Sequence, residues 1–309
     1  MTLLFWLSIF VISLVVLVKG ADWLLESAEK IGLAVGLSSF IVGVVIVGLG
    51  TSLPELFSGL MALFRGVNEI VAANAIGSNI ANILLVVGVA AIISKKLTVT
   101  KDLIDLDLPL LTISTVIFVI AAWDRQISLR ESILLLVVYL IYLGYTFMSR
   151  EDDDGKTKRP KLKTVDFVWL IAGIIGLVVG AKYLIDSVIK ISEMLSLAPG
   201  VVSLVAVAFG TSLPELLVSV KAALNNKPEV AIGNIFGSNI FNILVVIGIP
   251  GLFSRLQLDE KTFAIGLPVM AVTTLIFVIS GISKRIHMWE GAMYLVVYLF
   301  FIGKLFGFL

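Results

Sequence analysis

The chain has 309 residues, of which 59% are hydrophobic and only 15% are charged, and its mean hydropathy is +1.09. Soluble domains carry about a quarter charged residues, so this composition indicates a membrane protein. The formal net charge of +1 excludes the basic excess that is typical of nucleic-acid-binding proteins. The absence of cysteine excludes disulfides, thiolate metal sites and cysteine nucleophiles.

A transmembrane helix needs about 20 predominantly apolar residues, and ten stretches of this chain have that character. They cover residues 2–20, 37–64, 70–93, 104–122, 132–148, 165–191, 200–224, 229–252, 262–281 and 289–308. The first stretch follows no basic region, so we interpret it as a span and not as a removable signal peptide. We predict an all-helical membrane protein with ten transmembrane helices, the second and seventh long enough to be tilted or broken.

One long polar connection, residues 149–164, separates two groups of five apolar stretches. Its charged run from Arg150 to Pro160 contains no apolar residue, so we interpret it as a solvated linker. The connection therefore divides the chain into a first half, residues 1–148, and a second half, residues 165–309.

The two halves repeat each other at an offset of 160 residues. The segment GTSLPEL at 50–56 returns unchanged at 210–216, and NAIGSNIANIL at 74–84 returns as NIFGSNIFNIL at 234–244. An odd number of spans in each half makes the second half cross the membrane in the opposite sense. We therefore predict two inverted five-helix repeats, an architecture typical of secondary transporters that bind substrate near the midplane.

Lysine and arginine in the loops predict the orientation, because cytoplasmic loops carry the excess of these residues. The connections on the linker side hold about twice as many of them as the connections on the other side. We predict a multi-pass protein of the cell membrane with a cytoplasmic linker and both termini outside.

Two prolines interrupt long apolar stretches of the sequence. Pro54 and Pro214 each remove a main-chain donor, so the carbonyls of Gly50 and Gly210 lose their usual helical partners. Free carbonyls at membrane depth need something to bind. Hydroxyl and carboxylate side chains flank both breaks, namely Thr51, Ser52 and Glu55 in the first half and Thr211, Ser212 and Glu215 in the second.

A carboxylate deep in a bilayer is costly unless a partner compensates its charge. Glu55 and Glu215 have no lysine or arginine close in sequence, so we expect the counter-charge to be the transported substrate. On the adjacent stretches, hydroxyl and amide side chains share one helical face in the pairs Ser78 with Asn82 and Ser238 with Asn242. An all-oxygen ligand set without histidine or cysteine favours hard cations such as Ca²⁺ or Na⁺.

These paired segments resemble the two alpha-repeats of the cation/Ca²⁺ exchanger (CaCA) superfamily, here residues 43–89 and 203–249, and are most similar to its prokaryotic sodium/calcium exchangers. The resemblance implies a Na⁺/Ca²⁺ antiporter that works by alternating access and exchanges three Na⁺ for one Ca²⁺. It also implies that no cofactor is needed besides the transported ions, and that a monomer in the lipid bilayer suffices.

The resemblance further implies a role for each residue at the matching positions. The central carboxylates would be Glu55 and Glu215, and Asn82 and Asn242 would line the middle position. Main-chain oxygens of Thr51 and Thr211 would bind Ca²⁺. The flanking Na⁺ sites would be completed by hydroxyls and carbonyls of Ser52, Ser78, Ser212, Ser238, Gly48 and Ala208.

Several alternatives stay open at this point. Some relatives, including the potassium-dependent branch, carry a carboxylate where this chain has Asn242, and proton-coupled relatives usually place a glutamate in the asparagine-rich segments. A Ca²⁺/H⁺ or K⁺-dependent exchanger is therefore the second hypothesis. A cation channel is less favoured, because selectivity filters usually come from oligomeric rings whereas this chain repeats itself internally. An intramembrane hydrolase is also less favoured, because the one histidine, His287, lies outside the predicted spans. We expect Asn79 and Asn239 to be packing or helix-end residues, and Glu26 and Asp186 to be solvated interface charges.

Overall fold

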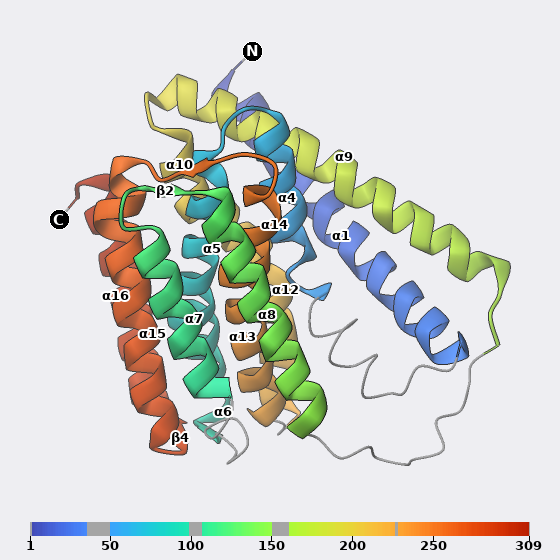
Figure 1. Cartoon of the computed structure of the whole chain (residues 1–309), viewed down its shortest axis with the longest axis vertical. Coiled ribbons are helices and arrows are strands. Elements are labelled where there is room, and N and C mark those ends of the chain that lie inside the picture. The colour runs from blue at the N-terminus through green and yellow to red at the C-terminus, as the bar shows by residue number, and fades with distance from the viewer. Residues whose placement is uncertain (1, 36–49, 99–106, 150–160, 226–227, 309) are drawn as a thin grey trace.

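The computed structural model of the protein describes residues 2–35, 50–98, 107–149, 161–225 and 228–308. The described part is helical apart from four short strands (Figure 1), which confirms the predicted all-α class. Each of the ten predicted stretches contains helix. Within these described ranges, six helices are long and apolar enough to cross a membrane, or seven when the bent pair Pro199–Thr211 and Leu213–Leu224 counts as one span.

The elements of the first half follow the predicted stretches closely. They are α1 (Leu3–Val35), α4 (Leu53–Phe64), α5 (Glu69–Ile80), the π-helical segment η2 (Ala81–Val87), α6 (Gly88–Ser94), β1 (Lys96–Thr98), α7 (Leu108–Ala121), β2 (Gln126–Ile127) and α8 (Leu129–Ser149). Helix α1 ends at Val35 and is therefore much longer than the stretch 2–20 predicted for it.

The second half has the corresponding order of elements. They are α9 (Thr164–Leu195), α10 (Pro199–Val202), the π-helical segment η4 (Ser203–Val207), α11 (Ala208–Thr211), α12 (Leu213–Leu224), α13 (Pro228–Phe241), η5 (Asn242–Val246), α14 (Gly248–Gly251), β3 (Leu256–Gln257), η6 (Thr262–Gly266), α15 (Leu267–Ile282), β4 (Arg285–His287) and α16 (Met288–Phe306). The predicted break of the seventh stretch lies between α11 and α12.

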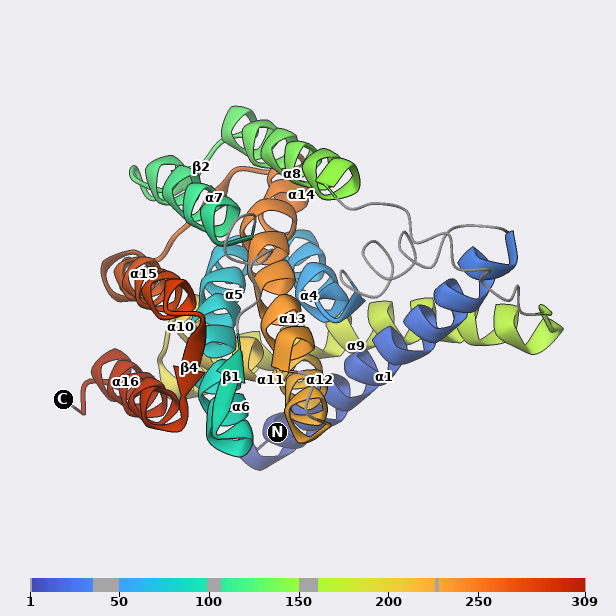
Figure 2. The ribbon, with the colours of Figure 1, turned by 90° about the horizontal axis from the view of Figure 1, so that it is seen from below.

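Two helical rods form the centre of the molecule. Figure 2 shows α5 and α13 in the middle, with α7, α8, α15 and α16 on one side and the long pair α1 and α9 crossing on the other. In the most apolar 18 residues of each central rod, Glu69–Ser94 and Ala231–Gly251, 78% of the residues are buried. The corresponding share in Leu3–Ala34 is 22%. The asparagine-rich segments therefore lie in the core, although they contain several polar residues.

Helices α1 and α9 pack through glycines that bring their backbones together. A Cβ atom on Gly20 would lie 2.7 Å from the Leu177 nitrogen, and one on Gly173 would lie 2.6 Å from the Leu24 nitrogen. No side chain fits at such distances, so the approach depends on glycine. Small residues serve the same purpose at helix interfaces inside membranes, where packing replaces the hydrophobic driving force.

We expect Gly173→Ala to destabilise the folded protein by about 1–3 kcal/mol, because the added methyl group forces two backbones apart. At roughly 2–4 °C per kcal/mol, the melting temperature of the purified protein should fall by several degrees. Gly144→Ala in α8 is the matched control, since nothing lies within 4 Å of the position that its added methyl group would occupy and alanine favours a helix. Equal melting temperatures for the two variants would contradict the close packing of α1 against α9.

Two small sheets join loops at opposite ends of the molecule. Strand β1 pairs antiparallel with β4, and β2 pairs with β3. In Figure 1, β4 lies at the lower end and β2 at the upper end, and both chain termini lie at the upper end. Each sheet combines one strand from each half of the chain, so the connections of the two halves meet in pairs.

Candidate cation-binding site

Both candidate carboxylates lie in the first turn of a helix, and in the second half this helix follows a break in the same span. The residues Ser52 (φ −92°, ψ 9°) and Ser212 (φ −81°, ψ 5°) are not helical, and α4 and α12 begin directly after them. A proline is the second residue of each of these helices, where its missing donor causes no loss. The first main-chain bonds of the new helices run from Leu56 N to Ser52 O at 3.3 Å and from Leu216 N to Ser212 O at 3.1 Å.

The structure brings Glu55 and Glu215 into one buried cluster in which the two halves contact each other. Both side chains are fully buried. The Ser78 hydroxyl donates to Glu55 Oε1 at 3.4 Å, and the Ser238 hydroxyl donates to Glu215 Oε1 at 3.3 Å, so the two halves repeat this contact. Ser52 also donates to Glu215 Oε1 at 3.1 Å and thereby links the first half to the carboxylate of the second.

One oxygen of each carboxylate, Oε2, is buried without a hydrogen-bond partner. The ion pairs formed by the described residues all lie elsewhere, for example Arg65 with Asp186 at 2.7 Å. Within the described ranges, no lysine or arginine compensates Glu55 or Glu215. Unpaired buried charge is expensive, and a bound cation is one way to compensate it.

The two middle asparagines lie where each central rod changes from α- to π-helix. Asn82 is the second residue of η2 and Asn242 is the first residue of η5, and both are fully buried. Asn82 Oδ1 and both amide atoms of Asn242 lack partners. Because an unsatisfied buried polar group costs about 1–3 kcal/mol, the two oxygens, Asn82 Oδ1 and Asn242 Oδ1, are candidate ligands. Single π-turns inside α-helices are frequent at functional sites.

The flanking hydroxyls do not form identical contacts in the two halves. Thr51 Oγ1 lies 3.4 Å from Ser238 Oγ, whereas Thr211 Oγ1 donates to the carbonyls of Val207 at 3.1 Å and Ala208 at 3.4 Å. The Ser212 hydroxyl has no partner. The Ala208 carbonyl also accepts the Ser212 amide at 3.0 Å, and Gly48 lies outside the described residues.

The sequence analysis gave no role to Asn74, an asparagine that binds the first turns of α4. Asn74 is fully buried, and its Nδ2 donates to Ser58 Oγ at 3.0 Å and to the Glu55 carbonyl at 3.4 Å. Ser58 donates to the same carbonyl at 2.9 Å. The signal in the sequence was the return of Asn74 as Asn234, which donates to Ser219 Oγ at 3.4 Å.

Asn79 and Asn239 connect the two central rods, beyond the packing role expected of them. Asn79 Nδ2 donates to the Asn239 carbonyl at 3.2 Å, and Asn82 Nδ2 donates to Asn239 Oδ1 at 3.1 Å. Gly77 permits close approach of the rod to the broken helix, because a Cβ there would lie 2.1 Å from the Leu204 carbonyl oxygen.

The chemistry of the cluster fits a hard cation. Carboxylate, hydroxyl and amide oxygens are the preferred ligands of Ca²⁺, and thiolate or imidazole ligands for softer metals are not part of it. Among the described residues, no group of three or more His, Cys, Asp or Glu side chains could hold a metal ion. Two carboxylates and several neutral oxygens therefore distinguish this site from a zinc or iron centre.

The comparisons with known proteins agree with this chemistry. The profile of the family described as "Sodium/calcium exchanger protein" matches residues 5–148 and 165–306. The chain belongs to the sodium/calcium exchanger protein family. The two matches to one profile coincide with the two halves found by their internal repetition. The resemblance to the prokaryotic exchangers of the CaCA superfamily is thereby confirmed.

Two relatives and one solved structure cover nearly the whole of this exchanger-family chain. This chain is 32% identical to the sodium/calcium exchanger MaX1 of Methanosarcina acetivorans, over 96% of this chain and 97% of the relative. An uncharacterized membrane protein of Methanocaldococcus jannaschii is 34% identical, over 96% of both chains. A structure of the sodium-calcium exchanger NCX_Mj soaked with Na⁺ and Sr²⁺ matches with a TM-score of 0.69 and 32% identity, over 96% and 97% of the two chains.

Proposed function

We propose that this chain is a secondary antiporter that moves Na⁺ inward and Ca²⁺ outward by alternating access at one central site. The observation that carries the proposal is the pair of buried carboxylates, one from each half, which no described lysine or arginine compensates. A bound Ca²⁺ neutralises this pair, while the empty site keeps two negative charges in a low-dielectric region. Reorientation of the empty site is then unfavourable, and this penalty couples the two ions.

We further propose that the ten helical stretches form two inverted five-helix repeats, residues 1–148 and 165–309, joined by the linker 149–164. The two small antiparallel sheets, each with one strand from each half, support this arrangement. Strands β1 and β3 follow equivalent helices in the two halves, and yet they belong to sheets at opposite ends of the molecule. The ion ligands would be Glu55, Glu215, Thr51, Thr211, Ser52, Ser212, Ser78, Ser238, Asn82, Asn242, Gly48 and Ala208.

The proposed orientation gives the first test. An epitope tag inserted within residues 151–159 should be protected in intact cells, whereas a C-terminal tag should be accessible to an impermeant antibody, because the linker side carries the excess of lysine and arginine. Permeabilised cells, in which both tags must react, are the control. Accessibility of the linker tag in intact cells would reverse the orientation.

Potassium should be dispensable. Asn242 is neutral and its amide atoms lack partners, so no third carboxylate balances an additional monovalent ion at the centre. Na⁺-driven ⁴⁵Ca²⁺ uptake into proteoliposomes should therefore stay the same when choline replaces K⁺ on both sides. Asn242→Asp is the companion variant, since it introduces a third carboxylate at the centre. A strict K⁺ requirement of the unmutated protein would contradict the ligand set.

The competing function is a cation channel, because oxygen ligands also build selectivity filters. The geometry favours the exchanger, since a single chain provides the whole cluster from its own two halves. Saturable ⁴⁵Ca²⁺ uptake that requires an opposing Na⁺ gradient supports exchange. Uptake that continues after the Na⁺ gradient is removed would instead establish a channel.

A further inference from the structure

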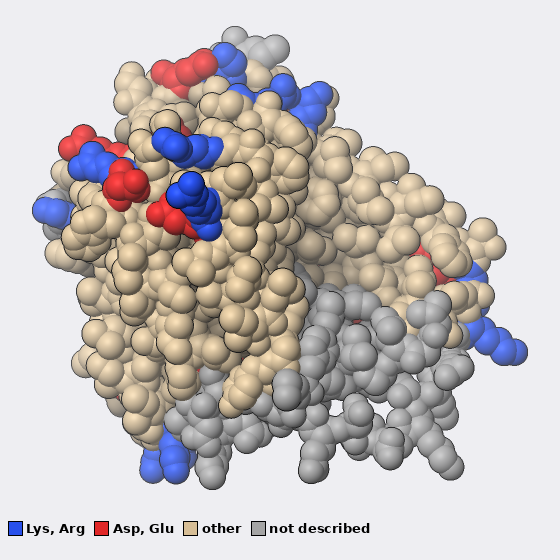
Figure 3. Space-filling view, viewed as in Figure 1, with Lys and Arg blue, Asp and Glu red and all other residues tan. Residues whose placement is uncertain are grey.

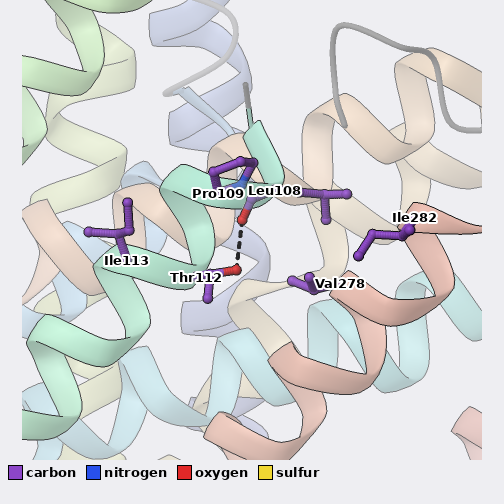
Figure 4. Close-up of a pocket in the computed structure, with 6 residues that line it drawn as sticks. All are labelled: Leu108, Pro109, Thr112, Ile113, Val278 and Ile282. Atoms are coloured by element: carbon purple, nitrogen blue, oxygen red, sulfur yellow. Dashed lines mark hydrogen bonds between the residues drawn. The ribbon is translucent and has the colours of Figure 1, made fainter. Parts of the chain in front are cut away.

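An open apolar groove follows the outer face of the contact between α7 and α15. One part of it is lined by Leu108, Pro109, Thr112, Ile113, Val278 and Ile282, drawn as sticks in Figure 4. A second part shares Thr112 and continues along Val116 and Ile120. The hydroxyl of Thr112 donates to the Leu108 carbonyl of its own helix at 2.8 Å, so this hydroxyl needs no partner from within the groove.

The dimensions of the groove suit one extended hydrocarbon chain. The segment from Leu108 to Ile120 spans about 18 Å at 1.5 Å per helical residue, slightly more than one leaflet of a hydrocarbon core that is about 30 Å thick. Ile113, Val116 and Ile282 are each more than half exposed. The groove therefore follows nearly the whole length of α7, from Leu108 to one residue before the helix ends at Ala121.

A basic cluster lies at the end of the groove marked by Leu108 and Ile282. Lys284 follows Ile282 by two residues, and Lys96 lies opposite His287 in the β1–β4 pair. Leu97 and Ile286 are fully buried on the inner face of this pair, so Lys96, Arg285 and His287 alternate outward and are exposed. None of these basic residues belongs to an ion pair among the described residues.

The opposite end of the molecule offers an internal comparison. The β2–β3 pair there places Arg125 and Arg255 at the positions that Lys284 and Lys96 occupy in the β1–β4 pair. Both of these arginines are engaged, because Arg255 donates to Gln126 at 3.0 Å and Arg125 lies 4.8 Å over the Phe263 ring. Figure 3 shows acids and bases interspersed at the upper end, but basic side chains without visible acids at the lower edge.

We propose that this groove and its basic end form a binding site for one anionic phospholipid. An acyl chain would fill the groove between α7 and α15, and the phosphate would lie over Lys96, Lys284 and Arg285. Charge complementarity selects this occupant, since basic pockets between transmembrane helices bind acidic headgroups. A second copy of the chain fits less well, because a parallel neighbour would bring two unpaired basic clusters together.

Native mass spectrometry of the delipidated full-length protein in detergent tests the proposal, because it counts bound lipids and copies of the chain together. Dioleoylphosphatidylglycerol should bind at least about tenfold more tightly than dioleoylphosphatidylcholine. Lys96→Gln combined with Lys284→Gln should weaken phosphatidylglycerol binding about 10- to 30-fold, from the contribution of two basic residues near a headgroup. The matched control, Arg255→Gln with Arg125→Gln, should leave the affinity unchanged.

Two further measurements separate the groove from a diffuse surface charge. Dihexanoylphosphatidylglycerol has the same headgroup but short chains, and it should bind at least about tenfold more weakly, since it cannot fill the groove. Thr112→Phe, which narrows the groove at its shared residue, should weaken dioleoylphosphatidylglycerol binding without changing the melting temperature of the lipid-free protein. Three results would each overturn the proposal. They are an equal loss of phosphatidylglycerol affinity in the two double variants, an equal affinity for the dioleoyl and dihexanoyl lipids, and dimers of the chain in place of bound lipid.

Discussion

Glu55→Gln and Glu215→Gln should each abolish Na⁺-driven Ca²⁺ uptake in proteoliposomes while leaving the protein folded. Each substitution keeps the shape of the side chain but removes half of the negative charge that balances a divalent ion. Loss of one partner from a buried charge pair costs about 3–5 kcal/mol, so the apparent Ca²⁺ affinity should fall by at least about 100-fold.

A matched control separates a local effect from a general one. Glu193 is exposed and pairs with Lys190 at 2.7 Å on the surface of α9, so Glu193→Gln should transport like the unmutated protein. All three variants should elute from a sizing column like the unmutated protein and melt at no lower temperature, because glutamine at either buried position removes an uncompensated charge. Ca²⁺ uptake at the unmutated rate in either buried variant would exclude Glu55 or Glu215 as a ligand.

Exchange should also respond to the membrane potential. A site with two carboxylates is neutral with one Ca²⁺ and carries one positive charge with three Na⁺, so each cycle moves one net charge. A potential of 100 mV then contributes about 2.3 kcal/mol per cycle, roughly a 50-fold change in the equilibrium Ca²⁺ ratio. The repeated hydroxyls beside the carboxylates, such as Ser52 and Ser78, would provide the neutral oxygens that additional Na⁺ ions need on this account.

Valinomycin-clamped K⁺ gradients across Na⁺-loaded proteoliposomes measure this response. An inside-positive potential should speed ⁴⁵Ca²⁺ uptake and raise its plateau, because three Na⁺ leave for each Ca²⁺ that enters, and an inside-negative potential should do the opposite. Vesicles with equal K⁺ on both sides are the reference. A plateau that ignores the potential would indicate electroneutral exchange of two Na⁺ for one Ca²⁺.

Much of the fold followed from composition and internal repetition alone. The ten apolar stretches contain helices, and the prolines at positions 54 and 214 lie in the first turns of α4 and α12. The excess length of α1 could not be predicted from hydropathy, because it depends on packing. Gly20 and Gly173 let α9 lie directly against α1, and this contact supports helix well beyond the apolar stretch.

The candidate site was only partly predictable from its motifs. The repeated segments pointed to Glu55 and Glu215, and the structure buries both in one cluster. The π-turns at Asn82 and Asn242 left no trace in a sequence pattern, since a π-turn changes hydrogen bonds and not residue types. The bridge from Asn79 to Asn239 was missed for a different reason. It joins two halves whose relative placement is set only by the folded chain.

The measurement that tests the central claim most directly is ⁴⁵Ca²⁺ uptake into proteoliposomes with Na⁺, K⁺ or H⁺ gradients imposed one at a time at zero membrane potential. We predict saturable uptake that is driven by an outward Na⁺ gradient, is absent with K⁺ or H⁺ alone, and is lost in Glu55→Gln and Glu215→Gln. Uptake driven by a proton gradient, or uptake that persists without any opposing gradient, would contradict Na⁺/Ca²⁺ exchange at this pair of carboxylates.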